Sequence, residues 1–220
     1  MISVIVPVVR PEKAQRCIEA IKKHSGGVVH EIVVENDTDR IGCPQMVKKL
    51  ADRAFFDWVM FLGDDTIPQE GFMANAIKHI YDLPDEWGMI GLNDQVWNGN
   101  VVATHWLCHK RMLEITGGEF FHTGYYHTEC DRELTEVAQE HGRYIWAEDA
   151  KIEHENYQVG TSDEQDEHHK HAYRDSAQRH DQVLYLERKE ARIGFKLGVG
   201  IPLINDMVDT LFLYSMMLMN

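Results

Sequence analysis

Hydrophobic residues in the first 65 positions follow two patterns that alternate along the chain. Short apolar runs cover residues 2–6, 32–34 and 58–62, and they are rich in the β-branched and aromatic residues typical of strands. Residues 14–21 and 47–54 instead repeat apolar positions at the i, i+3, i+4, i+7 spacing of a helix face. Strand and helix patterns in this order predict right-handed βαβ units, and so an α/β fold with a mostly parallel central sheet flanked by helices.

The remaining elements are less regular. They are predicted at residues 72–80 (helix), 89–92 (strand), 101–108 (strand), 128–141 (helix), 144–146 (strand) and 151–153 (strand). Residues 161–170 are almost wholly polar. This stretch is typical of a surface loop, or of the frayed start of a helix that runs to about Arg192.

The patterns divide the chain into three parts. We expect a core at residues 1–157, a polar loop and helix at 158–192, and a strand–helix segment at 193–220. Residues 195–204 resemble residues 2–9, because each run is a strand pattern that ends near a proline. The last segment is therefore either the start of a truncated second repeat or the strand and helix that complete the first domain.

Charge and cysteine usage narrow the classes of partner. The 220 residues carry a formal net charge of −14, which argues against a broad nucleic-acid-binding surface and against an anionic membrane surface as partner. The four cysteines are scattered without a CxxC pair, so no thiolate zinc site is predicted. The N-terminus lacks a signal-peptide pattern, and the apolar C-terminus, interrupted by Asp206 and Asp209, is too short to span a bilayer. We therefore expect a soluble, cytoplasmic protein.

Candidate ligand-binding residues follow three of the predicted strands, where ligands bind in sheets of this kind. They are Pro7, Val9 and Arg10 after the first strand, Glu35 and Asp37 after the second, and Gly63, Asp64 and Asp65 after the third. A bare phosphate site would prefer glycines and backbone amides at these ends. The acidic ends instead favour a ribose hydroxyl, a base edge or a divalent cation.

The strongest local signal is the segment FLGDDTIP, residues 61–68. Asp64 and Asp65 are adjacent carboxylates after a buried strand, and a divalent cation with oxygen ligands, such as Mg²⁺ or Mn²⁺, would relieve their repulsion. The same residue types are common in turns, so a loop without a metal is the alternative. His154 follows a short strand and is a candidate metal ligand only together with Asp65.

Asp131 is the candidate general base. It lies in the first turn of the helix predicted over residues 128–141, where the helix dipole stabilises a carboxylate. A carboxylate that projects from there into a cleft could also remove a proton, with Glu129 as the second choice for this role. The EHHKH cluster at residues 167–171 looks like a metal site, but its polar surroundings favour a solvated segment.

These motifs, taken in order, resemble a known family. A strand ending in VPVVR, one ending in VVEND, one ending in FLGDDT, a helix beginning with CDREL, and EH after a short strand resemble the GT-A fold glycosyltransferases of the family 2-like group. The resemblance covers roughly residues 1–157. Around GDDTIP and GLNDQVW it is nearest to phage-encoded members.

The resemblance implies a metal-dependent, inverting transfer of a sugar from a nucleotide-sugar donor to an acceptor hydroxyl. It implies a donor site at Pro7, Val9, Arg10, Glu35, Asp37 and Asp64, a Mn²⁺ or Mg²⁺ site at Asp65 and His154, and a base at Asp131. Gly63 departs from the pattern, because many members have a third aspartate there. The resemblance implies only the class of the acceptor, which is unidentified. It is a saccharide or, if the protein is phage-type, a modified nucleic-acid base. A phage-type protein would act in the cytoplasm of its host.

Two other functions stay open from the sequence. One is a catalytically decayed GT-A-like module with a binding or scaffold role, since one copy in a tandem protein can lose activity. The other is a nucleotidyltransferase, which is less favoured because VPVVRPEK has no glycine-rich loop after the first strand. An active transferase is favoured by the joint presence of Asp64, Asp65, Asp131 and His154.

Overall fold

The first strand, β1 (Ile2–Val8), has buried side chains on both of its faces, as expected for the interior of a sheet. Its apolar even-numbered residues join one core cluster, whereas Ile5 joins the other. β1 pairs in parallel with β2 (His30–Asn36) on one side and with β3 (Trp58–Phe61) on the other. The computed structural model describes residues 1–156, 160 and 167–197.

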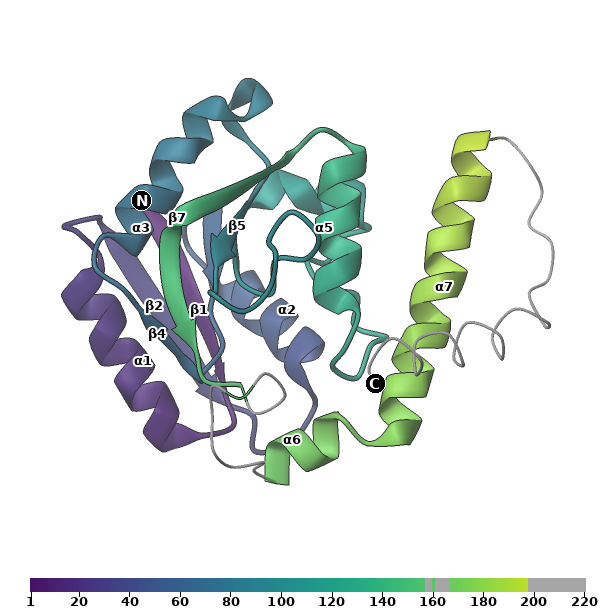
Figure 1. The fold of residues 1–220 in the computed structure, drawn as a ribbon, viewed down its shortest axis with the longest axis horizontal. Coiled ribbons are helices and arrows are strands. Elements are labelled where there is room, and N and C mark those ends of the chain that lie inside the picture. Colours follow the sequence, from purple (N-terminus) through teal and green to yellow (C-terminus); the bar gives the residue numbers. More distant parts are fainter. Residues whose placement is uncertain (157–159, 161–166, 198–220) are drawn as a thin grey trace.

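One seven-stranded sheet runs through this part of the chain, in the order β2-β1-β3-β6-β5-β7-β4 (Figure 1). The remaining strands are β4 (Thr66–Pro68), β5 (Met89–Asn93), β6 (Trp106–His109) and β7 (Tyr144–His154). β6 is antiparallel to both of its neighbours, and β4 is antiparallel to β7, while the other pairs are parallel. Five strands therefore share one direction, which confirms the predicted α/β architecture with a mostly parallel sheet.

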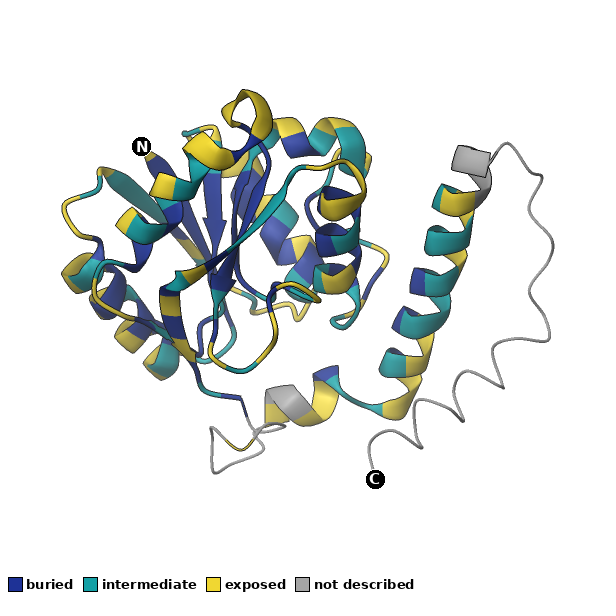
Figure 2. Cartoon of the chain, turned by 45° about the horizontal axis from the view of Figure 1, so that its top comes forward, coloured by how far each residue is buried: buried dark blue, intermediate teal, exposed yellow. Residues whose placement is uncertain are grey.

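Helices cover both faces of the sheet, so that the buried strands lie in the middle layer (Figure 2). Apolar residues of α1 (Pro11–His24) and α3 (Phe72–Lys78) belong to the cluster of the even-numbered β1 residues. Apolar residues of α2 (Cys43–Arg53) and α5 (Cys130–Glu140) belong to the cluster on the opposite face. Shorter helical segments and the C-terminal helices complete the described chain: η1 (His79–Asp82), η2 (Pro84–Glu86), η3 (Lys110–Met112), α4 (Leu113–Thr116), α6 (Glu167–Ala172) and α7 (Asp175–Leu197).

Several strands differ from the prediction. The two short strands expected near residues 144–153 form the single strand β7, whose pairing with β5 shifts register after Leu92. The strand expected over residues 101–108 begins only at Trp106, since the preceding residues form turns. β4 was not predicted, because three residues are too few to show a periodic pattern.

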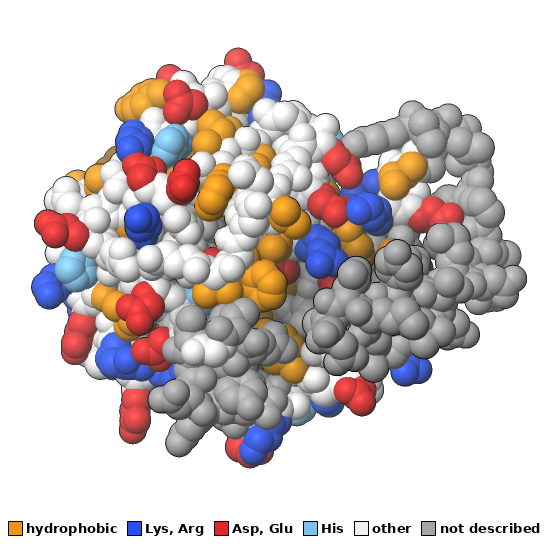
Figure 3. All heavy atoms as spheres, in the orientation of Figure 1, with side chains coloured by type: hydrophobic (Ala, Val, Ile, Leu, Met, Phe, Trp, Pro, Cys, Tyr) orange, Lys and Arg blue, Asp and Glu red, His pale blue; other side chains and the backbone are white. Residues whose placement is uncertain are grey.

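The expected strand at residues 195–204 begins inside α7, which continues to Leu197. The rest of that run, and with it the expected repeat, lies outside the described residues. None of the helices in the described ranges combines the length and the apolar character needed to cross a bilayer. On the face shown in Figure 3, basic and acidic side chains are interspersed, while hydrophobic ones gather near its middle.

α7 is tied to the loop before α5 by one buried carboxylate. Asp181 has no exposed surface and accepts hydrogen bonds from the backbone N–H groups of Tyr126, His127 and Thr128, each at 2.8 Å. The Thr128 hydroxyl adds a further hydrogen bond of 3.2 Å. Asp181 therefore fixes the conformation of a loop that leads directly into Asp131.

Replacing Asp181 with Ala should lower the free energy of unfolding by about 3 kcal/mol, because it leaves the backbone N–H groups of residues 126–128 without a hydrogen-bond acceptor. Equilibrium unfolding in urea measures the loss. Glu187→Ala, at an exposed position of the same helix, is the matched control and should change stability by less than about 0.5 kcal/mol. Equal stability of the two variants would show that the loop does not depend on Asp181.

Candidate active site

A cavity of about 300 Å³ lies beyond the carboxyl ends of β1 and β3, where ligands bind in open α/β sheets. Its walls include all the predicted site residues except Glu35, namely Pro7, Val9, Arg10, Asp37, Asp64, Asp65, Asp131 and His154. Residues that are far apart in the sequence thus meet at one place. The loop of residues 94–105, the start of α5 and Tyr173 provide much of the remaining wall.

Asp64 closes the end of β1. Its carboxylate accepts hydrogen bonds from the backbone N–H groups of Val9, at 2.8 Å, and Arg10, at 2.7 Å. The Arg10 guanidinium also donates to it, with Nε at 2.9 Å. Asp64 is buried, so these contacts hold the first strand end against the third. Its observed contacts are with the chain itself rather than with the open part of the cavity.

Asp65 is the carboxylate that faces the centre of the site. Its Oδ2 atom lies 2.9 Å from Nη2 of Arg10, and its Oδ1 atom lies 3.8 Å from Nε2 of His154. Burial disfavours the charged form, but the positive charges of His154 and Arg10 outweigh it and lower the pKa of Asp65 to about 2. Asp65 is therefore ionised at neutral pH.

Gly63 stands where the resemblance suggests an aspartate, and the packing gives a reason for the glycine. A Cβ atom at this position would lie 2.7 Å from Oδ1 of Asp65 and 3.2 Å from Nε2 of His105. The first of these distances is shorter than van der Waals contact allows, so an aspartate would displace its neighbours. Because glycine has no Cβ atom, the Asp65 carboxylate and the His105 ring can both lie close to the backbone at this position.

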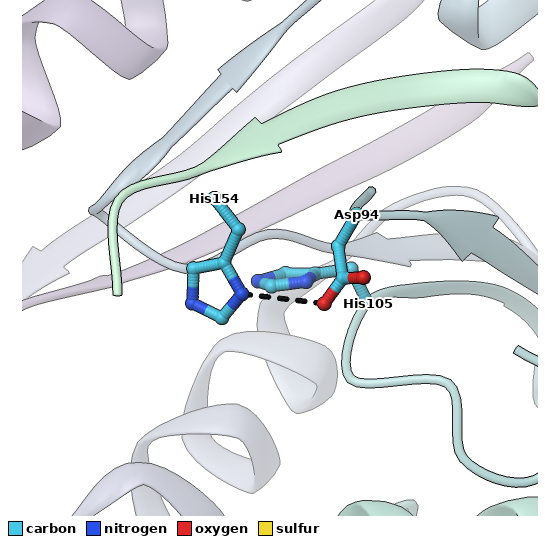
Figure 4. Close-up of side chains that lie close together, drawn as sticks. All are labelled: Asp94, His105 and His154. Atoms are coloured by element: carbon cyan, nitrogen blue, oxygen red, sulfur yellow. Dashed lines mark hydrogen bonds and ion pairs between the residues drawn. The ribbon is translucent and has the colours of Figure 1, made fainter. Parts of the chain in front are cut away.

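Asp94, His105 and His154 form a buried cluster beside Asp65 (Figure 4). One potential ligand atom from each residue lies within 4.8 Å of the others. Nδ1 of His154 lies 3.3 Å from Oδ2 of Asp94, and the two imidazole rings meet edge to face at 4.8 Å. The His105 ring also stacks on Phe61 of β3. Carboxylate oxygens and imidazole nitrogens are donors that fit a divalent cation.

The electrostatics of the cluster separate its two histidines. Burial, reinforced by the charge of His154, lowers the pKa of His105 to about 3, so this ring is neutral at neutral pH. Burial also opposes the charge of His154, but the hydrogen bond to Asp94 and the nearby carboxylates raise its pKa above the ordinary value. Burial disfavours the ionised form of Asp94, but the hydrogen bonds from His154, the Trp97 backbone N–H and the Thr104 hydroxyl outweigh it and hold the pKa of Asp94 well below its usual range.

Asp131 lies in the first turn of α5 and lines the same cavity. Its Oδ1 atom accepts a hydrogen bond of 2.8 Å from the backbone N–H of Arg132. Burial raises the pKa of the Asp131 carboxyl above its usual range. Glu129 also lines the cavity with a pKa raised by burial, but its carboxylate forms an ion pair of 2.8 Å with Arg132. Asp131 is therefore the better placed of the two to accept a proton.

The two acidic residues predicted after the second strand are placed differently. Asp37 lines the cavity, and its carboxylate accepts hydrogen bonds from the backbone N–H groups of Ile41 and Gly42. Glu35 is not among the lining residues. Its carboxylate pairs with Lys49 and Arg53 of α2 instead, because strand side chains alternate and Glu35 points toward that helix.

Asp94 and His105 were missed from the sequence. Asp94 directly follows β5 and His105 directly precedes β6, but both lie outside the βαβ pattern of the first 65 residues. The available signals were the position of Asp94 after a predicted strand and its place in the GLNDQVW segment. The EHHKH segment lies within α6, where Glu167 and Lys170 form an ion pair of 2.7 Å, and neither of these two residues is among those that line the cavity.

No protein-family model matches the chain, and the comparison with curated proteins finds no similar sequence. Solved structures do match. Mannosyltransferase PcManGT from Pyrobaculum calidifontis, in complex with GDP-Man and Mn²⁺, is 15% identical, with a TM-score of 0.57 over 91% of this chain and 65% of that one. S. aureus TarS 1–349 in complex with UDP-GlcNAc is 14% identical, with a TM-score of 0.55 over 90% of this chain and 76% of that one.

The chain has the GT-A glycosyltransferase fold. A third match, S. aureus TarS, is 14% identical with a TM-score of 0.53. The match covers 66% of this chain and 34% of that one. The GT-A match agrees with the resemblance seen in the sequence motifs. The chain spans about a third of this TarS structure and 65% of the mannosyltransferase, so both of these proteins contain regions that have no counterpart in the matched part of this chain.

Proposed function

We propose that the chain is a metal-dependent, inverting glycosyltransferase that moves a sugar from a nucleotide-sugar donor to an acceptor hydroxyl. One observation supports this proposal above the others. Asp65 and His154, which suit a divalent cation, line the same cavity as Asp131, which suits a base, at the ligand-binding edge of a GT-A sheet. The named complexes of similar folds contain nucleotide sugars, which is the substrate class expected here.

The donor would lie along the ends of β1, β2 and β3. Pro7, Val9 and Asp37 line the part of the cavity suited to the base and ribose, and Arg10 adds a positive charge between Asp64 and Asp65. Glu35, also a predicted donor residue, forms ion pairs with Lys49 and Arg53 of α2 instead of lining the cavity. Glu35 is therefore not among the residues that would contact the nucleotide.

Asp65 and His154 are the proposed metal ligands. A divalent cation bound there would neutralise the charge that builds up on the departing nucleoside diphosphate. Among the observed contacts, Arg10 lies on one oxygen of Asp65 and His154 lies near the other. These residues would orient the diphosphate so that the donor sugar points toward Asp131.

Asp131 would act as general base. Its carboxylate would take the proton of the acceptor hydroxyl while that oxygen forms a bond to the anomeric carbon. The bond between the anomeric carbon and the diphosphate oxygen would break on the opposite side, with its electron pair leaving on the nucleoside diphosphate. The raised pKa of Asp131 brings its proton affinity nearer to that needed at neutral pH.

The acceptor is proposed only as a class, a saccharide or a modified nucleic-acid base. Trp97 lines the cavity and keeps 41% of its surface exposed, so its ring can stack on either type of flat or apolar face. The formal net charge of −14 argues against a broad nucleic-acid-binding surface. If a nucleic acid is the acceptor, a single base held in the cavity is therefore the form we expect.

A thermal-shift panel tests the proposal without knowledge of the acceptor. Nucleoside diphosphates and nucleotide sugars are each added with Mn²⁺ and, separately, with a chelator. A ligand at 100 times its Kd should stabilise the native state by about 2.7 kcal/mol, which raises Tm by several degrees. We expect a shift with one nucleotide that disappears in chelator. The absence of a shift with every nucleotide would favour a decayed binding module instead.

A further inference from the structure

Tyr173 lies in the turn between α6 and α7, where it is half-buried and lines the cavity of the candidate site. This part of the chain follows the residues that carry the family resemblance, and α7 runs beside α5 (Figure 1). Among the described residues that line the cavity, Tyr173 is the one that comes from this C-terminal part. The segment after the GT-A core thus contributes a side chain to the site.

One neighbour of Tyr173 is fixed on the Asp65 side of the cavity. The buried Asn156 side chain forms a hydrogen bond with the Tyr173 hydroxyl. The backbone N–H of Asn156 donates to the carbonyl of His154 at 3.0 Å. Next to it, the backbone N–H of Glu155 donates to the carbonyl of Asp65 at 2.9 Å. Asn156 therefore holds Tyr173 beside the turn that carries Asp65.

The other neighbour, His127, is fixed on the Asp131 side. The rings of Tyr173 and His127 meet edge to face, with their centroids 5.1 Å apart. The backbone N–H of His127 is held by Asp181 at 2.8 Å, and Asp131 follows four residues later in the first turn of α5. Tyr173 therefore bridges the gap between the turn that carries Asp65 and the loop that leads to Asp131.

The sugar that is transferred must occupy this gap. In the proposed reaction the diphosphate leaves at Asp65 and the acceptor hydroxyl attacks beside Asp131, so the donor sugar lies between the two residues. Burial, reinforced by the charges of Asp131 and Asp65, raises the pKa of Tyr173 well above its usual range. The phenol consequently keeps its proton at neutral pH and can exchange hydrogen bonds with the hydroxyl groups of a sugar.

We propose that Tyr173 binds a hydroxyl group of the donor sugar and so helps to determine which sugar is transferred. The inference rests on the function proposed above. The base and ribose lie on other residues, at the ends of β1 and β2. Loss of the Tyr173 hydroxyl should therefore weaken the binding of a nucleotide sugar without weakening that of the nucleoside diphosphate.

Calorimetric titration of the full chain in Mn²⁺ makes this comparison. The probes are two pairs, UDP with UDP-GlcNAc and GDP with GDP-Man, whose sugar forms occur in the complexes of similar folds. For the pair that binds, Tyr173→Phe should weaken the nucleotide sugar by about 5- to 10-fold, the loss expected for one hydrogen bond, and leave the diphosphate unchanged.

Tyr185→Phe is the matched control. It removes the same hydroxyl group from α7, but the Tyr185 hydroxyl donates to Glu136 at 2.6 Å, and Tyr185 is not among the lining residues. Tyr185→Phe should bind both members of the pair as the wild type does. A Tyr173→Phe protein that binds both members unchanged, or both equally weakly, would overturn the inference. A wild type that binds none of the four compounds would contradict the proposed function, and the inference with it.

A second measurement detects the contact itself. Protein that is deuterated except at its tyrosine rings is mixed with the nucleotide sugar that binds, and the tyrosine ring protons are saturated. We expect the saturation to reach protons of the sugar, and Tyr173→Phe, with its phenylalanine rings deuterated, should abolish this transfer. Transfer that reaches only the base, or that persists in Tyr173→Phe, would overturn the inference.

Discussion

Replacement of Asp131 with Asn should lower kcat by about 10²- to 10⁴-fold while the affinity for the donor stays unchanged. The amide keeps the shape of the side chain but cannot take the acceptor proton. Asp131 lines the cavity from the first turn of α5, whereas Asp64 and Asp65 line it from the segment that follows β3. Transfer assays give kcat, and titration with the nucleoside diphosphate gives the affinity.

Glu129→Gln is the matched control for this experiment, because Glu129 lines the same cavity but is paired with Arg132. It should retain most of the activity. A fully active Asp131→Asn protein would assign the base to another residue, with Glu129 the next to test. The pH profile gives an independent check. The base works as a carboxylate, and burial raises its pKa, so kcat/KM should rise with pH through a value above the ordinary aspartate pKa of about 3.9.

Replacement of Asp65 with Asn should remove metal-dependent donor binding and leave the fold intact. Oδ1 of Asp65 faces His154, and the loss of its charge removes the main attraction for a cation at that point. We expect the Mn²⁺-dependent affinity for the nucleotide to fall by at least about 100-fold, which corresponds to about 2.7 kcal/mol. Calorimetric titration with and without Mn²⁺ measures this difference.

Glu155→Gln is the control for Asp65→Asn. Glu155 follows His154 directly, but its carboxylate pairs with Arg16 at the surface of α1. Its replacement should leave nucleotide affinity unchanged. Metal-dependent affinity that survives in Asp65→Asn would refute the assignment of Asp65. Together the two variants separate binding from transfer, because Asp65 is expected to act on the first and Asp131 on the second.

The sequence predicts the position of residues at strand ends. Pro7, Asp37 and Asp65 line one cavity because a buried apolar run ends directly before them or close by, and parallel strands bring such ends to one edge. Glu35 also lies at a strand end but is not among the residues that line the cavity, because the period of a strand decides the face of the sheet as well as the end. Neighbouring residues of a strand point to opposite faces of the sheet, and the Glu35 side chain points toward α2.

Residues held by irregular segments could not be predicted in the same way. Asp94 and His105 meet His154 only because a loop folds back over the sheet, and hydrogen bonds to Asp94 fix that loop. Asp181 lies on α7 and binds the loop before α5, more than 50 residues earlier. Contacts of this kind depend on side-chain hydrogen bonds in three dimensions, for which the sequence carries no periodic signal.

A crystal structure with Mn²⁺ and the nucleoside diphosphate that gives the largest thermal shift would test the central claim most directly. The account predicts an anomalous manganese peak beside Oδ1 of Asp65 and Nε2 of His154, with the diphosphate in contact with it. The base and ribose should lie along the ends of β1 and β2, and Asp131 should face the open side of the terminal phosphate. A nucleotide bound outside this cavity, or manganese away from Asp65, would contradict the account.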